Sequence, residues 1–106
     1  MILKSENNAD SIINNLHLET AKIPWKDLQR FFAGGKVLLV DAKLDLLRVA
    51  AAMVQDDSDV VSDWIKQGVI KYPDDALAKE WFETDRLLWA VVLNPWVLVQ
   101  EISVQQ

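Results

Sequence analysis

The segment Leu87–Ile102, LLWAVVLNPWVLVQEI, constrains the fold most because it is the longest apolar segment of the chain. Its branched and aromatic residues are typical of strands buried on both faces. Asn94-Pro95 divides the segment into two strand-like halves. Proline donates no ladder hydrogen bond, and an Asn-Pro pair does not fit the favoured two-residue hairpin turns. We therefore favour one long strand with a bulge or kink at Pro95, with a hairpin of two strands as the alternative.

The chain before this segment alternates between helical spacing and short apolar runs. Apolar spacing, capping residues and glycines predict helices from Ile12 to Ala21, Pro24 to Ala33, Leu44 to Val54, Asp57 or Ser58 to Gly68, and Asp74 or Asp75 to Phe82. A continuous apolar centre predicts a short strand at Lys36–Ala42, and Val69–Tyr72, closed by Pro73, is expected to form a second one. Residues 1–10 are mostly polar, and we expect them to fray.

These elements follow the order α-α-β-α-α-β-α-β(β), which indicates an α+β fold. We expect about five helices packed on a small sheet of about three or four strands. A chain of 106 residues has the length of one domain, so residues 1–106 are expected to form a single domain.

Three helices have apolar faces that we expect to be buried. Leu44–Val54 is apolar on nearly every side, which predicts a position inside the molecule or inside an interface. The next helix has Val60, Val61, Trp64 and Ile65 on one face, and the last predicted helix has Leu77, Ala78, Trp81 and Phe82.

The charge and composition exclude several classes of function. The net charge is −5, which argues against nucleic acid and anionic membranes as partners. The chain contains no cysteine and one histidine, His17, so neither a disulfide framework nor a metal site is predicted. No apolar run reaches the roughly 20 residues that span a bilayer. A cytoplasmic protein without cofactors is expected.

Carboxylates gather at the predicted junction of two helices, at Asp56, Asp57, Asp59 and Asp63. A calcium loop needs a glycine and regularly alternating oxygen ligands, and the cluster has neither. Helix capping is the simpler explanation. No phosphate-binding loop, nucleophile elbow or zinc motif is present, so an enzyme is not favoured.

Three stretches resemble a known family. They are ETAKIPWKDLQRFFAGGKV (Glu19–Val37), DLLRVAAAMVQDD (Asp45–Asp57) and LWAVVLNPWVLVQ (Leu88–Gln100). Together they are similar to a small bacterial family of roughly hundred-residue proteins classified as a domain of unknown function. The resemblance extends from Leu16 to Glu101. It implies a bacterial cytoplasmic protein and brings no functional residue with it.

Two functional hypotheses follow from an excess of apolar surface that includes five tryptophans. The first is a non-enzymatic interaction or accessory protein that forms a homodimer or binds an unidentified protein partner. The alternative is a small-ligand binder or enzyme with a tryptophan-lined pocket. Candidate interaction or pocket residues are Glu19, Lys22, Trp25, Arg30, Trp96 and Gln100, which lie in or beside the distinctive stretches; Trp96 is the foremost interface candidate.

Overall fold

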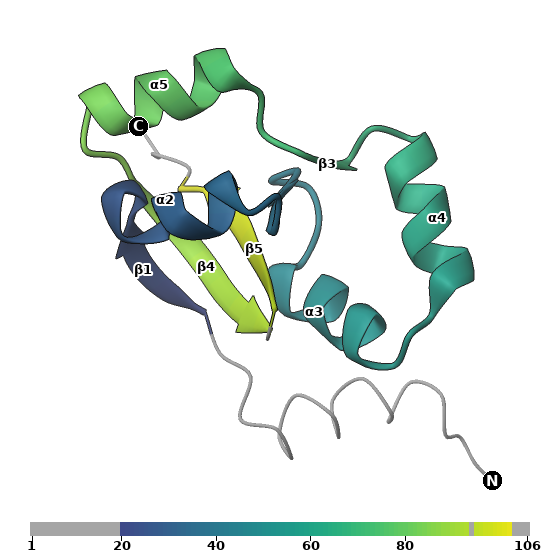
Figure 1. Ribbon diagram of the computed structural model, residues 1–106. Helices are drawn as coiled ribbons and strands as arrows, with labels where there is room; N and C mark the ends of the chain where they lie inside the picture. The colour runs from purple at the N-terminus through teal and green to yellow at the C-terminus, as the bar shows by residue number, and fades with distance from the viewer. Residues whose placement is uncertain (1–19, 94, 103–106) are drawn as a thin grey trace, which may run out of the picture.

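A five-stranded sheet forms the centre of the fold. The computed structural model describes residues 20–93 and 95–102. The strands are β1 (Ala21–Pro24), β2 (Val37–Val40), β3 (Ile70–Lys71), β4 (Leu87–Leu93) and β5 (Trp96–Glu101). Their order in the sheet is β1-β4-β5-β2-β3, and Figure 1 shows β1, β4 and β5 side by side. Strand β2 runs parallel to β5, and the other neighbouring strands are antiparallel.

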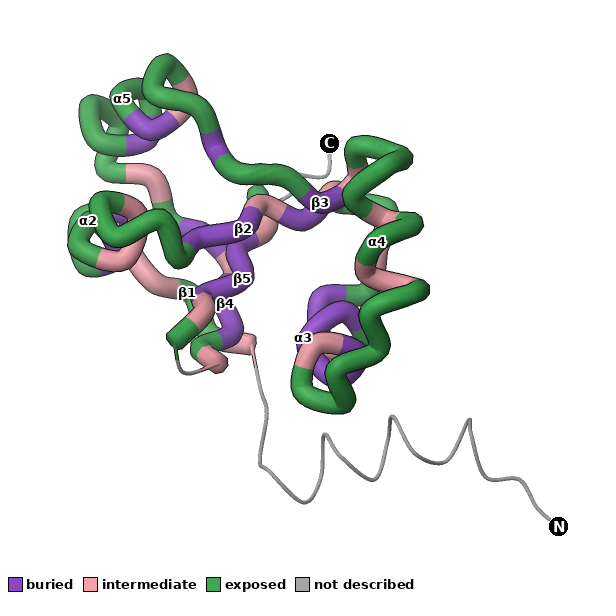
Figure 2. The backbone as a smooth tube through the Cα atoms, turned by 45° about the vertical axis from the view of Figure 1, so that its right-hand side comes forward, coloured by how far each residue is buried: buried purple, intermediate pink, exposed green. Residues whose placement is uncertain are grey.

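Helices cover both faces of the sheet. The described residues form four of them: α2 (Trp25–Ala33), α3 (Leu46–Val54), α4 (Ser58–Lys66) and α5 (Asp75–Glu83). Figure 2 shows α2 and α5 on one side of the strands and α3 and α4 on the other. The fold is therefore a small mixed α+β domain in three layers, which confirms the predicted class.

Alternate residues of the central strands face the two helical layers. In β5, Val97 and Val99 belong to the core under α2 and α5, while Leu98 belongs to the core under α3. All three are completely buried. This arrangement explains why the strands are continuous apolar runs, because a sheet covered on both faces needs apolar residues at every position.

The segment Leu87–Ile102 forms a hairpin, so the expected single kinked strand is wrong. Leu93 pairs with Trp96, and two residues separate them. Pro95 lies in the turn, where its missing N–H removes no ladder hydrogen bond. Antiparallel pairing of the two halves also satisfies backbone groups that a single isolated strand would leave unpaired.

The sheet has more strands than expected because β1 was predicted to be the end of a helix and a break. Ala21–Pro24 instead pairs with β4, with Ala21 opposite Ala90 and Pro24 opposite Leu87. A proline is tolerated there because β1 is an edge strand. The helix predicted from Ile12, the fraying predicted for residues 1–10, and His17 lie outside the described residues. The expected count of about five helices is thus four in the described part, on five strands rather than three or four.

Capping contacts confirm the predicted starts of α4 and α5, whereas α3 begins at Leu46 rather than Leu44 and α2 at Trp25 rather than Pro24. Asp57 accepts a hydrogen bond from the Val60 amide, and Asp74 accepts one from the Leu77 amide. Gly35 and Gly68 follow the ends of α2 and α4 with positive φ angles of 72° and 76°. These contacts explain why polar and glycine residues predicted the helix ends well.

Two expected inner faces are only partly covered. Helix α3 is buried as predicted, but no residue of α4 is buried, and Ile65 is 53% exposed. On α5, Ala78 and Trp81 are buried, whereas Phe82 is 44% exposed rather than internal. The partly exposed apolar face of α4 forms one wall of the candidate site.

Candidate functional site

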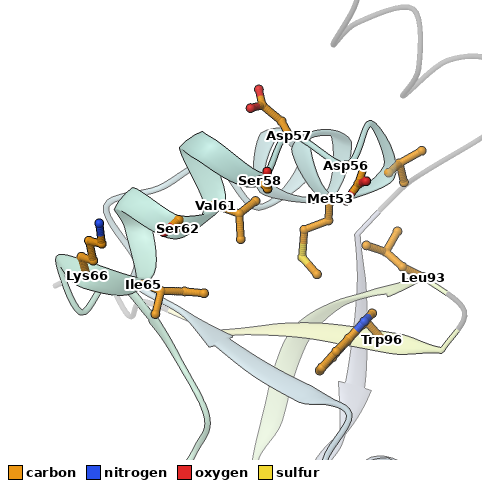
Figure 3. Close-up of a pocket in the computed structure, with 11 residues that line it drawn as sticks. Met53, Asp56, Asp57, Ser58, Val61, Ser62, Ile65, Lys66, Leu93 and Trp96 are labelled. Atoms are coloured by element: carbon orange, nitrogen blue, oxygen red, sulfur yellow. The ribbon is translucent and has the colours of Figure 1, made fainter.

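A pocket of about 800 Å³ lies between α4, the end of α3 and the tip of the β4–β5 hairpin. We call it the α4 groove. Its apolar lining is Met53, Val54, Val61, Ile65, Leu93 and Trp96. Figure 3 shows Met53, Val61 and Ile65 directed from the helices toward Leu93 and Trp96. The groove is the place where the apolar face of α4 does not reach the sheet.

The junction of α3 and α4 produces this opening. Asp56 has a positive φ of 58° and reverses the chain after α3. Asp57 then caps α4 with its side chain. The short connection holds the start of α4 beside the end of α3. One member of the acidic cluster, Asp57, therefore caps α4, as the sequence indicated, and its side chain points away from the groove (Figure 3).

Trp96 forms the aromatic wall of the groove at the start of β5. Its ring is partly exposed, lies 6.4 Å from the Tyr72 ring and has the Lys36 Nζ atom 5.1 Å from its centroid. Tyr72 itself is 60% exposed. The sheet therefore presents two aromatic side chains and a cation at this end, beside the apolar face of α4.

The polar lining of the groove is simple: Asp56, Asp57, Ser58, Ser62 and Lys66. The acidic residues lie at the beginning of α4, and Lys66 lies at its end. Among the described residues that line the groove there is no histidine, so this lining supplies no imidazole base for Ser58 or Ser62. Within the part of the chain that the structure describes, no group of three or more acidic or histidine side chains could hold a metal ion.

Of the six candidate residues from the sequence, the structure places Trp96 in the groove. Trp25 is completely buried in the core under α2 and α5. Arg30 is exposed on α2, 5.1 Å from the Phe31 ring centroid. These two side chains and Trp96 do not form one site, and Glu19 lies outside the described residues.

Lys22 and Gln100 have other contacts. The Lys22 Nζ atom lies 5.1 Å from the centroid of the Trp89 ring, in a cation–π contact across β1 and β4. The Gln100 Nε2 atom donates to the carbonyl oxygens of Asp41 and Leu44, at 2.9 and 2.8 Å. Gln100 thus fixes the connection between β2 and α3, which is a structural role.

Sequence reasoning missed Met53 and Leu93 as groove residues. It identified the apolar face containing Val61 and Ile65 but predicted that this face would be internal. The sequence did contain a signal for this opening, because two helices with apolar faces, α3 and α4, follow each other with only a short loop between them. One face of a small sheet has insufficient area to cover both.

The chain is thus a small mixed α+β domain with a largely apolar groove between α4, the end of α3 and the β4–β5 hairpin. Residues 11–101 match the family described as "Protein of unknown function (DUF2288)", so the chain belongs to that family. This confirms the resemblance to a family of unknown function. No curated protein matches the chain.

The chain is also similar to PA1075 from Pseudomonas aeruginosa, whose solution structure was determined by NMR. The two are 40% identical, with a TM-score of 0.76, over 100% of this chain and 97% of that chain. This similarity supports the mixed α+β fold. In the described ranges, 20–93 and 95–102, no helix is long and apolar enough to cross a lipid bilayer.

Proposed function

We propose that this chain is a non-enzymatic protein-interaction or accessory protein whose α4 groove receives an amphipathic helix of its partner. The observation that carries the proposal is the incomplete burial of α4. Val61 and Ile65 lie four residues apart on one helical face, yet Ile65 is 53% exposed beside a partly exposed Trp96. Contiguous apolar surface of this kind marks interaction sites.

The shape and chemistry of the groove favour a helix as the occupant. Amphipathic helices bind grooves by inserting apolar residues at positions i, i+3, i+4 and i+7. The groove runs along α4, a helix of nine residues, so its wall can contact a partner helix of about the same length. Asp56 at one end of the groove and Lys66 at the other favour a partner helix with basic residues at the first end and acidic residues at the second.

An Ile65→Asp substitution tests this proposal. It places a charge in the apolar wall of the groove and should weaken partner binding by about tenfold or more. Because Ile65 is half exposed, the fold should persist, which far-ultraviolet circular dichroism verifies. Phe82→Asp is the matched control, since Phe82 is a similarly exposed apolar residue on α5, across the sheet.

The experiment begins with affinity capture by the tagged full chain and continues with the captured protein after purification. Calorimetry then measures its affinity for the wild type and both variants. Equal affinities for wild type and Ile65→Asp would overturn the proposal. Light scattering provides the second readout. A mass of twice 12.1 kDa that Ile65→Asp reduces to the monomer would assign the groove to a second copy instead.

A small-ligand binder is the second candidate, and the volume of the groove supports it. About 800 Å³ lies within the range of roughly 300–1,000 Å³ that small-molecule sites occupy. The groove lining contains one tryptophan, Trp96, whereas Trp25 and Trp81 belong to the opposite core. A thermal-shift screen of metabolites separates the two functions, because ligand binding to the native state raises the unfolding temperature.

As part of the same proposal, we assign the protein to the bacterial cytoplasm. The absence of cysteine in the sequence suits a reducing compartment. The similar PA1075 comes from a bacterium.

A further inference from the structure

The β1 strand brings the preceding part of the chain close to the α4 groove. Ala21 pairs with Ala90, and β1 is antiparallel to β4. The residues before Ala21 therefore lead toward the hairpin tip, where Leu93 and Trp96 line the groove. Leu93 lies three positions after Ala90, a distance of roughly 10 Å along a strand.

The segment 11–19 has the length and the sequence of an amphipathic helix. Nine helical residues extend about 13 Å, which equals the length of the nine-residue α4. Ile12, Ile13 and Leu16 fall on one face at helical spacing, and Asn14 falls on the opposite face. This is the pattern that the groove favours in an occupant.

We infer that residues 11–19 of the same chain occupy the α4 groove in the resting protein, with their apolar face against Val61, Ile65 and Trp96. A partner helix binds by displacing this segment. The displacement rests on the proposed function, whereas the contact within the chain does not.

The short connection favours an occupant from the same chain over a second copy. A binding segment joined by a short tether has an effective concentration in the millimolar range. A second copy at micromolar protein concentration is much more dilute. The segment therefore occupies the groove in preference to a second copy, even with modest intrinsic affinity.

Disulfide mapping in the full chain tests the contact, because the sequence contains no cysteine. The pairs Ile13→Cys with Ile65→Cys, and Leu16→Cys with Val61→Cys, should form intramolecular disulfides under mild oxidation. Mass spectrometry then finds a monomer that is two hydrogens lighter and contains the linked peptides. Ile13→Cys with Phe82→Cys is the control and should keep free thiols.

Two results would overturn the inference. Free thiols in both test pairs would show that the segment is not in the groove. Disulfide-linked dimers would show that a second copy supplies the occupant. Loss of partner binding in Ile65→Asp would still support the proposed function in either case, so the two failures are distinguishable.

The displacement has its own measurement in the full chain. Ile13→Asp should loosen the segment and tighten binding of the purified partner by about tenfold, because a competing occupant lowers the apparent affinity. Asn14→Asp adds the same charge on the opposite face and should leave the affinity unchanged. Equal effects of the two variants would contradict displacement.

Discussion

Trp25 and Trp81 are neighbours in one aromatic cluster but differ in hydrogen bonding. Their ring centroids are 4.9 Å apart at an interplanar angle of 63°, and both residues are completely buried. The Trp81 Nε1 atom donates to the Glu101 carboxylate at 3.0 Å. The Trp25 Nε1 atom is buried with no acceptor among the described residues. The two indoles are thus a matched pair with and without a hydrogen bond.

Replacing each tryptophan by phenylalanine should separate packing from hydrogen bonding. Both substitutions remove buried surface, but Trp81→Phe also removes a hydrogen bond to a charged group. We therefore expect Trp81→Phe to lower the free energy of unfolding by about 1 kcal/mol more than Trp25→Phe does. Urea denaturation followed by circular dichroism measures both values. An equal or larger loss for Trp25→Phe would contradict this explanation.

The surroundings of a residue could be predicted from the sequence only where they depend on its near neighbours in the chain. Trp96 was chosen because it follows the expected kink at Pro95, and the structure places it in the lining of the α4 groove. The contacts of Gln100 could not be predicted, because its acceptors are backbone carbonyls 56 and 59 residues earlier in the chain. Local sequence contains no record of such distant partners.

The four described helices end in the same way. In each, the residue two positions beyond the helix has a positive φ, and it is Gly35, Asp56, Gly68 or Asp85. In α2, the Gly35 amide donates to the Phe32 carbonyl, and the Lys36 amide donates to the Phe31 carbonyl. This is the Schellman motif, in which a left-handed residue satisfies the last helical carbonyls.

Gly35 and Gly34 are adjacent, but only Gly35 has a backbone conformation that favours glycine. Gly35 has φ +72°, and an added Cβ would meet no atom within 4 Å, so Gly35→Ala suffers from backbone conformation alone. We expect it to lower the stability by about 1 kcal/mol. Gly34 has φ −83°, and its added Cβ would make ordinary contacts, the nearest at 3.6 Å.

Gly34→Ala is therefore the control and should be neutral or stabilising by less than about 1 kcal/mol. Thermal unfolding of the two variants provides the comparison. A stable Gly35→Ala variant would mean that the end of α2 adopts another conformation without loss.

Elements were predictable when their own residues specify them. Glycines and carboxylates marked helix ends, and continuous apolar runs marked β2 and β3. Strand β1 was missed because four residues, AKIP, contain too little pattern and become a strand only by pairing with β4. The hairpin was only the alternative in the sequence analysis, because turn preference at Pro95 argues against it; the gain from pairing six residues of each half is larger.

At the scale of the whole molecule, one sheet joins two cores. Val97 and Leu98 are adjacent in β5 and completely buried in opposite cores. Neither helical layer has a buried surface without the sheet, so the two layers should unfold together.

Leu98→Ala should therefore destabilise both layers at once. The substitution leaves a cavity under α3 and should lower the free energy of unfolding by about 3 kcal/mol. Amide exchange at increasing urea concentration follows the backbone amides of α3 on one face and those of α2 on the other. Both signals should shift to the same lower midpoint. A shift confined to α3 would show that the layers unfold independently.

The strand order also determines when the fold can form during synthesis. The central hairpin β4–β5 is made after β1, β2 and β3, yet β1 pairs only with β4, and β2 reaches its parallel partner only when β5 is complete. Such distant pairings close late because the intervening chain must first be ordered. Until the ribosome has released residues 87–101, the apolar faces of α2 and α3 have no sheet to cover them. The helices of both layers therefore gain their buried surfaces only after residues 87–101 have been made.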